Sequence, residues 1–226
     1  MAEAIAERVG SLGATGFAGR SRISMRKAGG RFLPRHTRGL DPGLAGEAAF
    51  EHPAVEAWWR WLVEEYTPHA QTALVTPCSN VKPYTRSPTS RKIRGLLRRL
   101  GLWDESASKP RRLAWLYLSD LLLLVPYERA EEYPACCYEV PPDLVLNNER
   151  LYRLVTSKLA HVLQALYGRG LRRVVLFLPR KHMRLWSAAY AASGAGFEVI
   201  SVGYHIFQVY SRLEPVLREV VRGRAR

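Results

Sequence analysis

The sequence predicts an α/β domain of three layers, with a mainly parallel, open sheet and helices on both faces. Three observations lead to this prediction. Short apolar runs of strand length alternate with amphipathic stretches of helical length along the chain. Residues 174–178 are apolar throughout, as expected for a strand that is buried on both faces of a parallel sheet. At 226 residues, the chain is long enough for one domain of this class.

The elements of this domain are expected within residues 49–226. Apolar positions at helical spacing predict helices over 53–66, 87–100, 148–167, 182–192 and 206–221, with Pro215 as a candidate break. Short apolar runs predict strands over 72–76, 113–118, 121–125, 174–178 and 197–202. The clustered Trp58, Trp59 and Trp61 suit either a helix packed on the sheet or a base-stacking platform, and the pattern favours packing.

Residues 1–48 differ from the rest of the chain. They are rich in Gly, Ala and Arg, and seven Arg and Lys residues occur between positions 20 and 38 without an acidic residue. Such a composition predicts a flexible basic arm that precedes the domain. A tail without a role is the alternative.

Composition narrows the class of protein. Lys and Arg outnumber Asp and Glu by 34 to 20, and the formal net charge of +14 favours a polyanionic partner, most simply a nucleic acid. The three cysteines, Cys78, Cys136 and Cys137, do not form a disulfide framework, which indicates a reducing compartment. No apolar run approaches the roughly 20 residues that span a bilayer, and the N-terminus has no apolar signal segment. We therefore expect a cytoplasmic protein that makes no membrane contact.

The most informative segment, residues 76–88, joins an expected strand to an expected helix. Prolines stiffen it, and Ser87 can cap a helix N-terminus whose free N–H groups suit an anion. A thiol near that positive end and near Lys82 is expected to have a lowered pKa, which would make Cys78 a nucleophile. The alternatives are a buried, inert Cys78 and a solvated Lys82.

Seven residues of this segment carry a resemblance, in the order Pro77-Cys78-Ser79-x-x-Lys82-Pro83-Tyr84-x-x-Ser87. The pattern resembles the signature loop of the archaeosine synthase family, PCSxxKPYxxSxSH. A second stretch is similar to that family as well, through Ser119, Val125-Pro126, Glu128 and Tyr133-Pro134-Ala135. The resemblance covers about residues 70–205, which correspond to the family's central domain, whereas its transglycosylase-like region and its RNA-binding domain have no counterpart here.

The resemblance implies a uracil-DNA-glycosylase-like fold and a role in tRNA modification. Archaeosine synthases act on the 7-cyano-7-deazaguanine nucleotide of archaeal tRNA and convert its nitrile towards an amidine by adding an amine, in some members that of free lysine. By this resemblance Cys78 would add to the nitrile carbon, Lys82 or Tyr84 would protonate the imide nitrogen, and Ser79 and Ser87 would hold a phosphate or the base edge. A version without the covalent step leaves Cys78 structural.

The resemblance is incomplete at one end of the motif. Thr89 and Ser90 stand where the family has Ser and His, so the sequence leaves open whether the chain is an enzyme. A non-catalytic module that binds RNA or a partner subunit is one alternative, and a partner protein would then supply the missing RNA-binding domain. A nucleobase-excision enzyme is another, but it needs a carboxylate or Asn near the first strand, where the loop offers only Asn80.

Polar residues at the other expected strand ends complete the candidate site. Ligands of parallel sheets bind beyond the carboxyl ends of the strands, which makes His205, after the last strand, a further candidate catalytic group by fold-level analogy. The candidate contacts to substrate or phosphate are Ser79, Asn80, Ser87, Arg86, Arg91, Arg180 and His182. No residue spacing predicts a metal site, and no Walker or GxGxxG loop is present, so we expect neither a metal nor a cofactor.

Basic residues concentrate on both sides of the signature loop. Residues 82–112 hold ten Lys and Arg residues and two acidic ones, and residues 169–184 hold six basic residues and no acidic one. Together they predict a cationic surface beside the loop and a tRNA partner, because phosphate neutralisation supplies much of the affinity for RNA. A solvated cationic face is the alternative.

Overall fold

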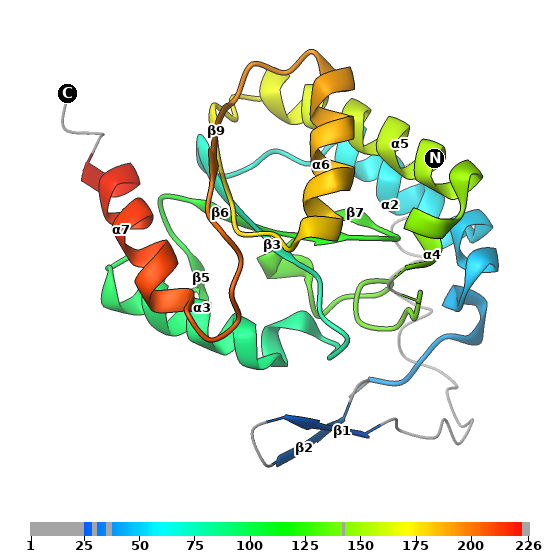
Figure 1. The fold of residues 1–226 in the computed structure, drawn as a ribbon, viewed down its shortest axis with the longest axis horizontal. Coiled ribbons are helices and arrows are strands. Elements are labelled where there is room, and N and C mark those ends of the chain that lie inside the picture. Colours follow the sequence, from blue (N-terminus) through cyan, green and yellow to red (C-terminus); the bar gives the residue numbers. More distant parts are fainter. Residues whose placement is uncertain (1–24, 29–30, 35–37, 142, 223–226) are drawn as a thin grey trace.

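A five-stranded sheet forms the centre of the protein, in the order β7-β6-β3-β8-β9. The computed structural model describes residues 25–28, 31–34, 38–141 and 143–222 (Figure 1). The strands are β3 (Thr72–Pro77), β6 (Ala114–Ser119), β7 (Leu123–Pro126), β8 (Arg173–Leu176) and β9 (Glu198–Ser201). All neighbours pair in parallel except β6 and β7, which are joined by a tight turn and pair antiparallel. The predicted mainly parallel sheet is confirmed.

Helices cover both faces of this sheet (Figure 1). One layer contains α2 (Pro53–Glu64), α5 (Glu149–Gly168) and α6 (Arg180–Ser193), and the other contains α3 (Pro88–Arg99) and α7 (Val209–Arg222). The three-layer arrangement is therefore confirmed, whereas the closer likeness to uracil-DNA glycosylases stays a prediction. No described helix is both long enough and apolar enough to cross a membrane.

The predicted end signals of α3 place its first turn beside the sheet edge. Ser87 caps the helix by accepting a hydrogen bond from the backbone N–H of Ser90 at 3.1 Å, and Pro88 occupies the first turn. Gly101 follows the helix with a φ of +67°, a conformation that glycine adopts without strain. At the C-terminal end of the chain, α7 continues through Pro215, where the sequence had suggested a break.

Two of the three clustered tryptophans belong to the core, as the packing interpretation predicted, and Trp61 packs against it while only partly buried. Trp58 and Trp59 are buried, and their indole N–H groups donate to the carbonyls of Leu124 and Leu121 at 3.2 and 2.8 Å. Their ring edges are thus fixed by the segment that carries β7. Neither ring is available as a base-stacking platform.

The N-terminal region contributes more structure than the arm prediction anticipated. The strands β1 (Met25–Ala28) and β2 (Arg31–Pro34) pair as an antiparallel hairpin. The 3-10 helices η1 (Pro42–Leu44) and η2 (Glu47–Glu51) follow, and Leu44 is fully buried in the core. The described domain thus extends N-terminal to residue 49 through apolar contacts that a weak local pattern did not reveal. The flexibility predicted for residues 1–24 lies outside the described residues.

Shorter elements complete the chain. The strands β4 (Trp103–Asp104) and β5 (Lys109–Pro110) form a small hairpin after α3. The single-turn elements η3 (Tyr84–Arg86), η4 (Tyr127–Arg129) and α4 (Leu144–Asn147) lie in connecting segments. Of these, η3 matters for function because it belongs to the signature loop, residues 76–88.

Candidate functional site

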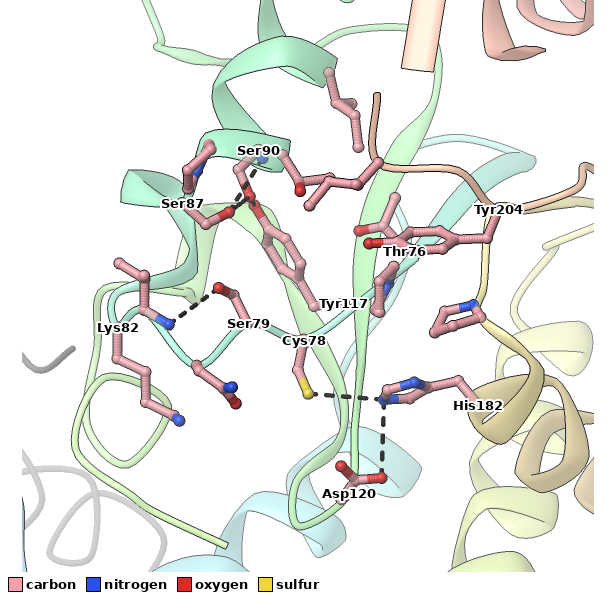
Figure 2. Close-up of a pocket in the computed structure, with 18 of the residues that line it drawn as sticks. Thr76, Cys78, Ser79, Lys82, Ser87, Ser90, Tyr117, Asp120, His182 and Tyr204 are labelled. Atoms are coloured by element: carbon pink, nitrogen blue, oxygen red, sulfur yellow. Dashed lines mark hydrogen bonds and ion pairs between the residues drawn. The ribbon is translucent and has the colours of Figure 1, made fainter. Parts of the chain in front are cut away.

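A cavity of about 440 Å³ lies at the carboxyl ends of the three central strands (Figure 2). Its walls come from segments that are far apart in the sequence: the loop after β3, the first turns of α3 and α6, the β6–β7 turn, and the loop after β9. This is the edge at which ligands bind in open parallel sheets. The polar lining residues include Thr76, Cys78, Ser79, Asn80, Lys82, Ser87, Ser90, Tyr117, Asp120, Tyr138, Lys181, His182 and Tyr204.

The signature loop is fixed by hydrogen bonds to β6 and within the loop itself. The backbone N–H of Cys78 donates to the carbonyl of Leu118 at 2.9 Å, which extends the pairing of β3 with β6 by one residue. The hydroxyl of Ser79 accepts from the backbone N–H of Val81 at 3.0 Å. Prolines 77, 83 and 88 restrict the backbone further. As a result, the side chain of Cys78 projects into the cavity from a rigid support (Figure 2).

Cys78 lies next to a histidine and a carboxylate. Its Sγ is 3.7 Å from Nε2 of His182, and the same Nε2 is 3.8 Å from Oδ1 of Asp120 (Figure 2). Lys181 forms an ion pair with the second oxygen of Asp120, with Nζ and Oδ2 separated by 3.3 Å. These four side chains come from three segments: Cys78 follows β3, Asp120 follows β6, and Lys181 and His182 lie in the first turn of α6 after β8.

The electrostatics of Cys78 differ from the expectation. Burial, with a further contribution from the charge of Asp120, raises the pKa of the Cys78 thiol to about 11, although Lys82 opposes the shift. The prediction of a lowered thiol pKa was therefore wrong, because desolvation outweighs the nearby cations. Burial, reinforced by Lys181, likewise lowers the pKa of His182 to about 3. At neutral pH both the thiol and the imidazole are uncharged.

Lys82 is part of the cavity and not a solvated surface cation. Its side chain is only 5 % exposed, and its Nζ lies 4.2 Å from the ring centroid of Tyr138. A cation over an aromatic face is held electrostatically, and the effect strengthens where water is excluded. The ammonium group is therefore presented to the cavity by Tyr138, which the sequence did not single out.

Tyr84 has a different role from the one the motif suggested. It is fully buried, does not line the cavity, and its hydroxyl is hydrogen-bonded to that of Tyr138. Tyr138 in turn bonds the hydroxyl of Ser119 at 2.7 Å. Burial keeps the pKa of Tyr84 well above its usual value. Its position argues against the expected proton transfer to substrate and makes it a support for Tyr138.

Two serine hydroxyls at the start of α3 form a second polar wall. Ser87 donates to the hydroxyl of Ser90 at 2.9 Å, and the Tyr117 hydroxyl donates to the same Ser90 oxygen at 3.0 Å. Ser87 thus acts both as the helix cap and as a cavity residue. Ser90, which stands at the histidine position of the family motif, faces the cavity too, so that departure falls within the site itself.

Several predicted site residues lie elsewhere. His205, Arg86 and Arg91 are exposed and are not among the described residues that line the cavity, although Tyr204 and Ile206 on either side of His205 do line it. Arg180 is exposed and lines a neighbouring hollow between α6 and the loop after β9. Ser79 and Asn80, by contrast, line the cavity as expected, and so does His182.

The basic face of α3 is partly neutralised within the chain. Arg98 pairs with Glu105 at 2.8 Å, and Arg99 pairs with Glu214 of α7. The guanidinium of Arg94 donates to the hydroxyl of Tyr127 at 3.1 Å. The predicted cationic surface beside the loop therefore included some charges that the fold uses for internal pairing.

Asp120 is the main site residue that the sequence reasoning missed. A signal was present, since Ser119 and Asp120 interrupt the apolar run of residues 116–127. The hydroxyl of Ser119 accepts from the backbone N–H groups of Leu121 and Leu122 at 3.2 and 2.9 Å and so fixes the turn that bears Asp120. A buried charge in such a turn needs a partner, and that requirement points to function.

Comparisons with known proteins add a distant relationship. No protein-family model matches the chain. Over 130 residues, or 56 % of the chain, it is 28 % identical to archaeosine synthase subunit alpha of Thermoplasma acidophilum, and the match covers 22 % of that protein. The similarity is distant. The chain thus spans less than a quarter of the length of this relative.

Among solved structures, the chain is similar to that of AF0587, described as a protein of unknown function. The two are 19 % identical, with a TM-score of 0.46, over 68 % of this chain and 48 % of that one.

Proposed function

We propose that the protein takes part in tRNA modification and acts on the 7-cyano-7-deazaguanine nucleotide of tRNA, converting its nitrile towards an amidine. One observation carries the proposal: Cys78 and Lys82 of the signature loop line the same cavity, opposite His182 and Asp120. The distant similarity to archaeosine synthase subunit alpha supports the substrate class. The expected tRNA partner and amine donor belong to this proposal.

The cavity suits a single modified base. Its volume of about 440 Å³ falls within the roughly 300–1,000 Å³ typical of small-molecule sites. Ile93, Val140 and Pro88 supply apolar wall area, and the hydroxyls of Ser87 and Ser90 supply hydrogen bonds to a base edge. A protein that performs chemistry on a base must take that base out of its stack, and a cavity with polar groups in its lining is suited to receive it.

The proposed reaction has two balanced steps. In the first, the sulfur of Cys78 bonds to the nitrile carbon, and the thiol proton ends on the nitrile nitrogen, which gives a thioimidate. Lys82 stabilises the charge that develops on this nitrogen during the addition. In the second, an amine bonds to the same carbon, the carbon–sulfur bond breaks, and an amine proton returns to the sulfur. The products are the amidine and the original thiol.

The position of Lys82 supports its role in this scheme. Its ammonium group is desolvated and held over Tyr138, so it needs little rearrangement to meet developing negative charge. The side chains of Ser79 and Asn80 line the cavity on the same loop and would contact the base or its ribose phosphate. An exposed His205 has no part in the scheme.

Incubation with tRNA that carries the nitrile base tests the proposal. With free lysine present, mass spectrometry of the nucleosides released by digestion should show the substrate mass increased by the mass of lysine. A covalent adduct between the protein and the tRNA should accumulate when the amine is omitted. Unchanged nucleosides and no adduct, with tRNA binding retained, would instead identify a non-catalytic binding module.

Nucleobase excision remains the second candidate function, because it needs a carboxylate near the end of β3. Asp120 lines the cavity there, although the sequence alone did not place it in the site. The same incubation distinguishes this activity, because excision releases the free base and leaves an abasic site in the tRNA. Release of free base without any amine product would overturn the proposed reaction.

A further inference from the structure

Three side chains of the types that bind transition metals converge on the floor of the cavity. Donor atoms of Cys78, Asp120 and His182 all lie within 4.8 Å of one another (Figure 2). We propose that they bind one divalent transition-metal ion, with zinc as the best match. The proposal goes beyond the proposed reaction on tRNA and does not depend on it.

The topology makes this convergence a property of the fold. The three residues follow β3, β6 and β8, which are adjacent in the sheet and parallel, so their carboxyl ends meet at one edge. Asp120 and His182 are 5 % and 2 % exposed, whereas clusters of acidic groups at a surface are open to water. The ligands are far apart in the sequence, and this explains why residue spacing predicted no metal site.

The distances are compatible with a shared ion, although the Cys78–His182 separation is also within reach of a sulfur hydrogen bond. Nε2 of His182 is 3.8 Å from Oδ1 of Asp120, which is beyond hydrogen-bond reach, and 3.7 Å from Sγ of Cys78. Tetrahedral zinc, with bonds of about 2.3 Å to sulfur and 2.0 Å to nitrogen, separates those two ligand atoms by about 3.5 Å. An ion therefore fits among the three groups with small side-chain adjustments.

The donor set selects the class of metal. Thiolate and imidazole ligands suit zinc and other late first-row ions, whereas calcium and magnesium take oxygen ligands. Three protein ligands leave one position of a tetrahedral site open, as in zinc sites that take a water or a substrate. All three residues line the cavity, so a ligand held there would have access to that position.

The charges around the site are compatible with a divalent cation. A thiolate and a carboxylate together balance its charge, so the loaded cluster would be neutral next to Lys181. Nζ of Lys181 lies 3.3 Å from Oδ2 of Asp120, which leaves Oδ1 directed to the cluster. Lys181 would then hold the carboxylate in place as an outer partner, a common feature of metal sites.

The site would also bear on the reactivity of Cys78. A metal-bound thiol is deprotonated, and the thiolate is the form that acts as a nucleophile. A bound ion would hold this thiolate with one of its lone pairs engaged in the metal bond, so an alkylating agent would react with the sulfur more slowly than with the metal-free residue.

Cobalt substitution tests the proposal without any tRNA. The purified protein, stripped with a chelator and titrated with Co²⁺, should bind one ion per chain and show a thiolate-to-cobalt charge-transfer band. Cys78→Ser should abolish that band. Asp120→Asn should weaken binding by more than the roughly 10–100-fold that loss of an outer partner produces. A matched control is the double variant Cys136→Ser and Cys137→Ser, which removes the other two thiols and should retain the band.

A measurement on the unaltered protein avoids any effect of the substitutions on folding. Alkylation of each cysteine by iodoacetamide can be followed by mass spectrometry of its peptide. Zinc should slow the alkylation of Cys78 and should leave that of Cys137 unchanged. Unchanged alkylation of Cys78, or a cobalt band that survives Cys78→Ser, would overturn the metal site. Because neither readout involves tRNA or an amine, the metal site and the proposed reaction can fail separately.

Discussion

The loop of residues 77–87 after β3 and the loop of residues 202–208 after β9 leave the same edge of one sheet, yet the first buries most of its polar side chains and the second leaves most of its side chains exposed. Lys82 and Ser87 are 5 % and 3 % exposed, whereas Phe207 in the other loop is 81 % exposed. The loop after β9 contributes Tyr204 and Ile206 to the cavity wall and directs His205 to solvent.

The position of the two strands in the sheet explains the difference. The strand β3 lies between β6 and β8, so the ends of both neighbours and the start of α3 surround its loop. The strand β9 is at the edge, pairs with β8 alone and is largely exposed. The rule that ligands bind at the carboxyl ends of strands locates both loops. The number of neighbouring strands then decides how firmly the side chains of each loop are held.

Replacing the nucleophile should give the largest difference between the two loops. Cys78→Ala removes the group that forms the thioimidate, so amine addition to the nitrile-bearing tRNA should fall by about 10³-fold or more. His205→Ala in the loop after β9 should change the rate by less than about threefold. Rates of nucleoside conversion measured by mass spectrometry check both values. Comparable losses in the two variants would show that the loop after β9 also contacts the reacting atoms.

The contrast between these loops also shows what the sequence could predict. The unbroken apolar run of residues 174–178 and the short β-type run of residues 72–76 predicted two central strands, because strands buried on both faces are rich in apolar residues. The motif predicted that Cys78 and Lys82 face a site. The approach of Cys78 to Asp120 and His182 could not be predicted, because it depends on the order of the strands in the sheet, which the local sequence pattern does not determine. The raised pKa of Cys78 depends on burial, which is equally a property of the assembled fold.

The cationic side chain of the inner loop provides the next test. Lys82→Met keeps the length and apolar stem but removes the charge over Tyr138, and the rate of amine addition should fall by about 10²-fold. Lys92→Met is the matched control, because Lys92 lies 5.3 Å from the ring centroid of exposed Phe207 and should change the rate little. Equal rates for Lys82→Met and the unaltered protein, with the same melting temperature, would remove Lys82 from the mechanism.

Stability should respond to the same contrast on a smaller scale. Tyr138→Phe removes a buried hydroxyl that is bonded to Tyr84 and Ser119, so the free energy of unfolding should fall by about 1–3 kcal/mol. Phe207→Ala in the exposed loop should stay within about 0.5 kcal/mol of the unaltered protein. Urea unfolding monitored by fluorescence and circular dichroism measures both. A larger loss for Phe207→Ala would mean that the outer loop packs on the domain in solution.

The smallest expected effect is a pH dependence of stability that arises from Glu131, which contacts Thr85 in the loop after β3. Glu131 accepts a hydrogen bond from Thr85 at 2.5 Å and pairs with Arg38 at 3.2 Å, and these contacts hold the pKa of Glu131 below its usual value. A carboxyl whose pKa is depressed in the folded state stabilises the protein at pH values above its pKa in the unfolded chain. That contribution is lost as the pH falls through the folded-state pKa. Glu131→Gln should therefore reduce stability at neutral pH by less than about 1 kcal/mol, because the pair is largely exposed. The difference from the unaltered protein should shrink as the pH falls through the depressed pKa of the folded state, and disappear below it. Urea midpoints across that range measure it, and a difference that persists in acid would assign the anchoring of Thr85 to packing instead of charge.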